Sequence, residues 1–203
     1  MILYTVQEMY TLDCLKEIGF YAPTYDAKEV IFDAEDEGNW SFYDSYEWLK
    51  TQMEHRKIHY DNYNRNMIWA YRSYYKTVRD GKITKPSLFK NEASFGDRPY
   101  VLMEIDIPDN RVLLSDYIAW HHVLNAFTIS KTNEFMGLKF DRSNFNEVSK
   151  NWHVIFDIPK IRRWMGVSKN NQDIQATFFE LYFTDLKRAW IFENNKITKI
   201  ENY

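Results

Sequence analysis

The sequence is poor in cysteine, glycine and proline. Its 203 residues include one cysteine, six glycines and five prolines. A single cysteine excludes an internal disulfide. The scarcity of glycine and proline argues against long low-complexity or linker segments. We therefore expect a folded chain.

Long apolar runs and an excess of positive charge are also missing. No apolar run reaches the roughly 18 residues that a membrane-spanning helix needs, and Met1 is followed by Ile2, Leu3 and Tyr4 rather than by a basic leader. We therefore expect no membrane partner, no signal peptide and a cytoplasmic protein. The formal net charge of −3 argues against broad, non-specific nucleic-acid binding, although a local basic patch is compatible with it.

Motifs of several catalytic classes are absent from the sequence. It contains no G-x-S-x-G, no G-x-G-x-x-G and no glycine-rich phosphate loop. His121 and His122 are adjacent, so on a helix they point to different sides, and a zinc site needs three or four ligands. We therefore expect no metal site.

Aromatic residues are abundant. Seven tryptophans, 14 phenylalanines and 15 tyrosines make up 18% of the chain, which is long enough to bury one sizeable core. We expect a single globular domain over residues 1–203.

The clearest pattern is YVLMEIDIPDNRVLLSDYIAWHHVLN, at residues 100–125. Residues 101–107 alternate in the manner of a strand, residues 108–110 have turn chemistry, and residues 111–114 predict a returning strand, so we expect a hairpin. Ser115 or Asp116 is suited to cap a following helix whose apolar side carries Trp120.

Other segments predict further strands and helices. Residues 2–6 are of β type, and Met9–Ile18 has helical spacing ended by Gly19. Thr5 is at capping-box spacing from Glu8, which suggests that it caps this helix. Residues 42–53 predict a second helix. The fold class expected is α+β, with a mostly antiparallel sheet flanked by several amphipathic helices.

Carboxylates occur in two segments whose side chains alternate as in a β-strand. Ala176, Phe178, Glu180 and Tyr182 share one side of an aromatic strand, which residues 188–192 follow as a second strand. If that side is buried, Glu180 needs a partner, because burial penalises the charged form. Another pair, Glu104 and Asp106, fits a solvated strand face at least as well as a general acid and base.

A long polar segment at residues 76–99 contains six lysines and arginines. Loops of this length in compact domains are uncommon and are often functional. The segment is therefore either a lid or basic edge beside a site, or a surface excursion.

Several segments together resemble a bacterial family known as domain of unknown function 3841. They are LYTVQ, FYDSYEWLKTQM, WAY, EIDIPDNRVLLSDYIAWHHVLN and QATFFEL, and they run over essentially the whole chain. The resemblance implies one intact domain of bacterial or phage origin. The family name implies no activity.

The segment FFELYFTDLKRAWIF is similar in layout to the end of the ADP-ribosyltransferase fold. That resemblance implies that Glu180 hydrogen-bonds a ribose hydroxyl of NAD and stabilises an oxocarbenium-like transition state as nicotinamide leaves. The acceptor is then an unknown protein or nucleic acid. LYTVQ takes the place of the first strand but offers Thr5 and Gln7 where those enzymes commonly have arginine or histidine. Phe178 stands where many toxins of the class have a second Glu or Gln.

The first hypothesis is therefore an NAD-dependent ADP-ribosyltransferase-like site. Glu180 is its catalytic residue, and Thr5, Gln7, Trp69 and Tyr71 are candidates to line the nicotinamide and ribose pocket, although aromatic residues at strand spacing are more often core. One alternative is a non-catalytic interaction module in which Glu180 pairs with a basic side chain. Another is a single-stranded nucleic-acid-binding domain that uses its aromatic rings and the basic residues of segment 76–98.

Overall fold

The computed structural model describes the chain in segments, namely residues 1–23, 42–58, 66–72, 78–79, 82–83, 98–131, 144–165, 174–194 and 196–200. The chain divides into two compact units, which are described separately. Unit 1 contains Met1–Pro23, Met67–Val112 and Ala176–Tyr203, and unit 2 contains Thr24–Asn66 and Leu113–Gln175. Strands and helices are both well represented, and the strand pairings with a defined register are antiparallel. The expected α+β class is confirmed.

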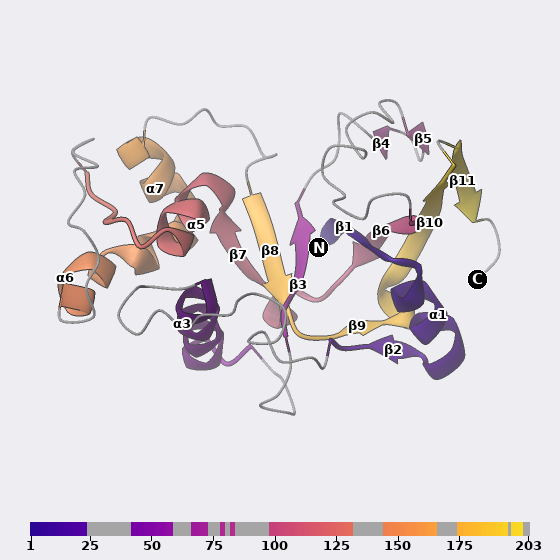
Figure 1. Ribbon diagram of the computed structural model, residues 1–203, viewed down its shortest axis with the longest axis horizontal. Coiled ribbons are helices and arrows are strands. Elements are labelled where there is room, and N and C mark those ends of the chain that lie inside the picture. The colour runs from indigo at the N-terminus through magenta and orange to yellow at the C-terminus, as the bar shows by residue number, and fades with distance from the viewer. Residues whose placement is uncertain are drawn as a thin grey trace. The chain divides into compact units, whose positions relative to one another are not determined.

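Unit 1 is built on a β-sheet with the strand order β11-β10-β6-β1-β3-β8 (Figure 1). The strands are β1 (Ile2–Glu8), β3 (Ile68–Tyr71), β6 (Tyr100–Asp106), β8 (Ile174–Phe178), β10 (Leu186–Glu193) and β11 (Lys196–Ile200). The first two residues of β8 belong to unit 2. Two small strand pairs complete the set, β2 (Phe20–Tyr21) with β9 (Leu181–Tyr182) and β4 (Val78–Arg79) with β5 (Lys82–Ile83).

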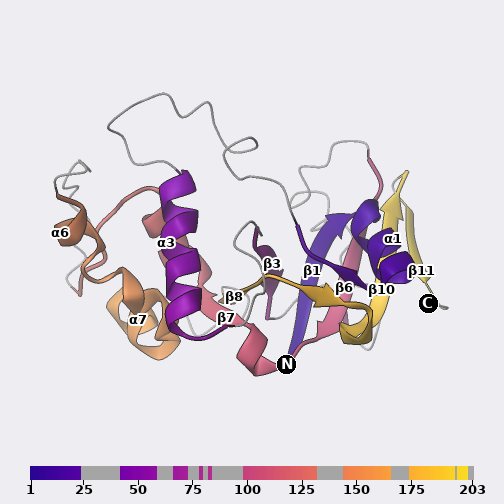
Figure 2. The same cartoon turned by 90° about the horizontal axis from the view of Figure 1, so that it is seen from below.

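Strand β1 is paired with β6 along its whole length, from Ile2 opposite Asp106 to Glu8 opposite Tyr100. Helix α1 (Met9–Ile18) follows directly and contacts β1 and β6 (Figure 2). Gly19 ends the helix with φ at 89°, where a side chain would be strained, and its N–H donates to the Leu15 carbonyl at 3.1 Å. The predicted helix and its glycine cap are confirmed.

The two faces of this sheet are both apolar. An aromatic cluster on one face consists of buried Tyr100, Leu102, Trp190 and Phe192, with Tyr4, Val6, Tyr71 and Ile197 packed against it. On the other face Leu3, Val101, Met103 and Ile105 are completely buried. Because side chains alternate between faces, β6 is enclosed on both sides, as a central strand should be.

Unit 2 is mainly helical (Figure 1). It contains α3 (Phe42–His55), β7 (Leu113–Asp116), α5 (Tyr117–Leu124), α6 (Phe145–Ser149), a 3-10 helix (Trp152–Phe156) and α7 (Ile158–Met165). The Trp48 ring meets Trp152 edge-on at 5.4 Å and stacks on Phe156 at 5.8 Å. Ser45 Oγ donates to the Val123 carbonyl at 3.1 Å, which ties α3 to α5. The helix predicted over residues 42–53 is confirmed.

The predicted hairpin over residues 100–114 is wrong. β6 has β1 and β10 as its neighbours, so β7 does not pair with it. A short 3-10 helix, Asp109–Arg111, separates β6 from β7 in the chain. A strand buried on both faces needs a partner along each edge, and β1 and β10 fill both positions. The predicted N-cap is confirmed, because Asp116 Oδ1 accepts from the Ala119 N–H at 3.1 Å.

The capping box proposed for Thr5 is also wrong. Thr5 lies inside β1, and the N-cap position of α1 is Glu8, which makes no side-chain cap bond.

Among the described helices, none combines the length and apolar character needed to cross a bilayer.

Candidate functional site

Glu180 lies in the short connection between β8 and β9 in unit 1, not inside a strand as predicted, because β8 ends at Phe178. The residue is only 9% exposed. Its Oε2 accepts a hydrogen bond from the Tyr182 hydroxyl. Burial of this carboxylate demands hydrogen-bonding partners, and a tyrosine two residues away is one of them.

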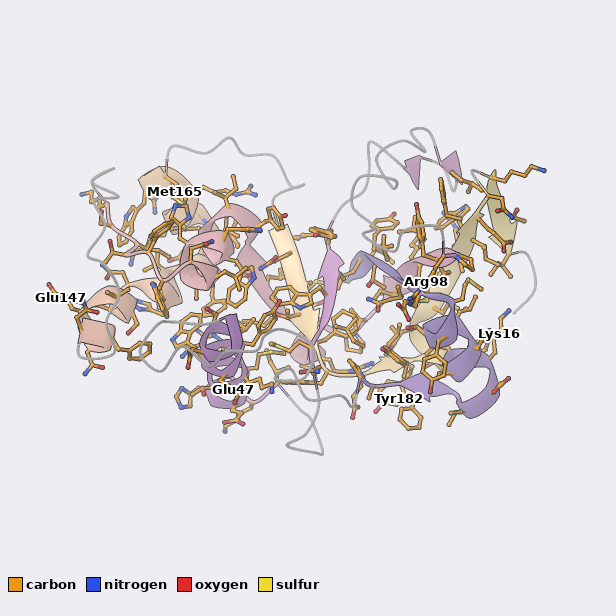
Figure 3. All side chains as sticks on the ribbon, viewed as in Figure 1. Lys16, Glu47, Arg98, Glu147, Met165 and Tyr182 are labelled. Atoms are coloured by element: carbon orange, nitrogen blue, oxygen red, sulfur yellow. The ribbon has the colours of Figure 1, made fainter. Side chains whose placement is uncertain are left out.

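Arg111 fixes the backbone around Glu180. One guanidinium nitrogen donates to the Glu180 carbonyl at 2.8 Å, and the other pairs with Asp185 Oδ1 at 3.0 Å. The guanidinium carbon also lies 4.6 Å from the centre of the Tyr182 ring. The second Asp185 oxygen accepts from the Tyr182 N–H at 2.9 Å. Arg111, Glu180, Tyr182 and Asp185 are thus joined by direct contacts. Tyr182 is labelled in Figure 3.

Removing the Arg111 side chain is expected to destabilise the protein by about 3 kcal/mol. Asp185 would remain as a buried carboxylate without its cation, since its side chain is 7% exposed. Arg111→Lys should cost less but still lose the forked geometry. The free energy of unfolding in urea measures the effect.

Arg163 provides the control for this experiment, because it is exposed and its bond within the described residues is a local one, to the Pro159 carbonyl at 3.2 Å. Arg163→Ala should change stability by less than about 0.5 kcal/mol. Equal losses in the two alanine variants would contradict the importance of the Arg111 contacts.

The β1 and β3 strands bring together three of the residues predicted to bind a cofactor. Within the described residues their ladder has one registered pair, Tyr4 opposite Tyr71. A side-chain hydrogen bond also joins the two strands: Thr5 Oγ1 in β1 donates to the Trp69 carbonyl in β3 at 2.7 Å. Gln7 Nε2 then donates to Thr5 Oγ1 at 2.8 Å. Thr5, Gln7 and the Trp69 backbone thus form one hydrogen-bonded group, the β1–β3 junction.

The rings of Trp69 and Tyr71 are not part of that group. Tyr71 is opposite Tyr4 in the ladder and packs against the aromatic cluster. Since side chains alternate, Trp69 shares the face of Tyr71, whereas Thr5 and Gln7 point to the other face. The expectation that all four side chains line one pocket does not fit this geometry.

The sequence interpretation missed a buried network at Glu104. This residue is 7% exposed, so the expected solvated face is wrong for it, whereas Asp106 is exposed. Glu104 Oε2 accepts from the Tyr4 hydroxyl at 3.1 Å and lies 3.5 Å from an Arg188 nitrogen. Burial raises the pKa of Tyr4 to about 12, and the Glu104 charge and hydrogen bond add to the shift.

Stability is expected to fall between about pH 10 and pH 12 because of Tyr4. The unfolded chain loses this phenol proton near pH 10, whereas the folded protein keeps it up to a pKa of about 12. In that window the unfolded state binds fewer protons, so the free energy of unfolding decreases as pH rises. Urea midpoints across the window should fall less steeply in Tyr4→Phe than in the wild type. Identical slopes would contradict the assignment.

Most of the basic segment at residues 76–99 lies outside the described residues. Of its basic residues, the structure describes the side chain of Arg98, which is exposed, with a nitrogen 3.8 Å from a Glu8 carboxylate oxygen. The segment's proposed role as a lid or basic edge stays a prediction.

Comparison with known proteins gives one match. The family model described as "Domain of unknown function (DUF3841)" matches residues 2–187. Neither the curated proteins nor the solved structures contain a significant match.

Proposed function

The chain belongs to the DUF3841 family, and we propose its function from the site geometry: NAD-dependent transfer of ADP-ribose to a protein or nucleic-acid acceptor, with Glu180 as the catalytic residue. The family description gives no activity, so the proposal depends on the arrangement of the strands and their side chains.

The observation that carries the proposal is the neighbouring position of β1, β3 and β8 in one sheet. β1 contributes Thr5 and Gln7, β3 contributes the Trp69 carbonyl, and β8 leads directly to Glu180. Segments that are far apart in the sequence thus become adjacent strands. A transferase needs such convergence, because it must hold nicotinamide and present a carboxylate to the ribose at the same time.

The β1–β3 junction is suited to an amide ligand. The half-buried Gln7 amide has both donors and an acceptor, whereas the completely buried Thr5 hydroxyl joins that amide to the Trp69 carbonyl and so holds it in place. We assign the nicotinamide carboxamide to this junction. Tyr71 belongs to the aromatic cluster and receives no ligand contact in this proposal.

Glu180 supplies the electrostatic part of the reaction. The bond between the ribose C1′ and the nicotinamide nitrogen breaks, and its electron pair neutralises the cationic ring, which leaves as nicotinamide. Positive charge develops on the ribose, and a buried carboxylate hydrogen-bonded to a ribose hydroxyl stabilises it. An acceptor lone pair then forms the new bond to C1′, and the acceptor's proton passes to water.

Transfer of label from NAD tests the proposal. The purified protein is incubated with bacterial lysate and NAD labelled in its adenosine half, and the macromolecules are then precipitated. We expect label in the precipitate. Its release by protease identifies a protein acceptor, and its release by nuclease identifies a nucleic acid. No labelled macromolecule would contradict ADP-ribose transfer to the acceptors in that lysate and favour the non-catalytic interaction module.

A further inference from the structure

We propose that Tyr182 is a positioning residue for Glu180 and that Arg111 and Asp185 hold Tyr182 in place for this purpose. This inference rests on the proposed function and extends it by naming the residues that orient the carboxylate. None of them was recognised in the sequence as part of a site.

Tyr182 is held at three points. Its N–H donates to Asp185 Oδ2 at 2.9 Å, one face of its ring lies under the Arg111 guanidinium at 4.6 Å, and its hydroxyl donates to Glu180 Oε2. Arg111 and Asp185 are themselves joined at 3.0 Å. The tyrosine therefore has little freedom to turn away from the carboxylate.

Glu180 is held from both ends by the same group of residues. Arg111 fixes its carbonyl at 2.8 Å, and Tyr182 fixes one carboxylate oxygen. An ionised carboxylate has two oxygens and about four acceptor positions, so a bond to Tyr182 is compatible with a further donor such as a ribose hydroxyl. Fixing one oxygen determines where the other can lie.

The orientation of a catalytic group affects the turnover rate more strongly than it affects the binding of substrate. A displacement of about 1 Å can reduce the rate about 100-fold. In Tyr182→Phe the ring keeps its contacts with Arg111 and with Phe20, whose ring centre is 6.4 Å away, and only the hydroxyl is lost. The variant should therefore fold normally and lose only the hydroxyl bond that fixes Glu180 Oε2.

Steady-state release of nicotinamide tests the proposal. Tyr182→Phe is expected to lower kcat by about 10- to 100-fold, with KM unchanged within about twofold. In a Glu180→Ala background the same change should cause no further loss, because Tyr182 acts through Glu180. Tyr10→Phe is the control: it removes a hydroxyl from a tyrosine that is 66% exposed on α1 and should leave kcat unchanged.

A spectroscopic measurement separates this proposal from the proposed function. With ¹³C-labelled glutamate carboxyl groups, the signal that disappears in Glu180→Gln should shift in Tyr182→Phe and stay in place in Tyr10→Phe. Unchanged kcat in Tyr182→Phe, or an equal additional loss in the Glu180→Ala background, would overturn positioning and leave the transferase standing. A wild type that releases no nicotinamide, while the NMR signal still shifts, would overturn the transferase and with it the catalytic purpose of the contact.

Discussion

Glu180→Gln is expected to reduce nicotinamide release from NAD on the order of 100- to 1000-fold, the usual cost of removing one electrostatic stabiliser of a transition state. Glutamine has the size of glutamate, and its amide oxygen can still accept from the Tyr182 hydroxyl. The fold should therefore be retained, and the lost quantity is the negative charge beside the ribose. Rates with saturating NAD measure the effect.

Glu104→Gln is the matched control for this variant. Glu104 is also a buried glutamate of unit 1 whose Oε2 accepts from a tyrosine hydroxyl, but it lies in the Tyr4 and Arg188 network. Its nicotinamide release should stay within about threefold of the wild type, since it touches no proposed ligand. Equal losses in both variants would show that any buried carboxylate of the sheet is needed for folding, and would remove the special status of Glu180.

Asp116→Ala is expected to cost about 4 kcal/mol of stability, the largest structural effect among the described residues. The carboxylate has two functions in unit 2. Oδ1 caps α5 through the Ala119 N–H at 3.1 Å, and Oδ2 accepts from Arg162 Nε at 3.3 Å. Both side chains are buried, with exposures of 1% for Asp116 and 10% for Arg162. Alanine removes the cap and leaves a buried guanidinium without this carboxylate.

Three variants separate these contributions. Asp116→Asn keeps a capping oxygen and should cost about half as much. Asp157→Ala removes an exposed cap on the Lys160 N–H, 3.2 Å away, and should cost about 1 kcal/mol or less. Arg162→Met combined with Asp116→Ala should recover part of the lost stability, because the buried guanidinium charge that Asp116 neutralises is removed as well. Urea unfolding provides all four values, and a loss in Asp116→Ala no larger than in Asp157→Ala would contradict the account.

Local features of the fold were predictable from the sequence. The α1 helix has its apolar spacing and its terminating Gly19 within one stretch of chain, and Asp116 caps α5 from three residues away. In both cases the determining contact is a few residues distant. The strand character of β1 and β6 follows equally from their alternation.

Strand partners were not predictable in the same way. The turn chemistry at residues 108–110 is real, but β6 pairs with β1 and β10, which lie about 100 and about 90 residues away in the chain. Alternation also could not show that both faces of β6 are buried, because an antiparallel sheet commonly has one wet face. For this reason a solvated strand face fitted Glu104 at least as well as a catalytic role.

The sequence pointed to Glu180 as a candidate site residue, but not to the distant residues that contact it. Glu180 stood out as a carboxylate among aromatic residues, and the spacing to Tyr182 was visible. Arg111 is 74 residues from Asp185 and 69 from Glu180, so no local pattern joins them. Thr5 was interpreted as a helix cap or a cofactor ligand, and its observed bond to the Trp69 carbonyl spans 64 residues.

The most direct test of the central claim is nicotinamide release from NAD by the purified protein with bacterial lysate as acceptor source. The account predicts free nicotinamide that accumulates with the wild type, in proportion to the amount of protein added, and that accumulates at least about 100-fold more slowly with folded Glu180→Gln. Nicotinamide at the buffer level with both proteins, or equal release by both, would contradict it.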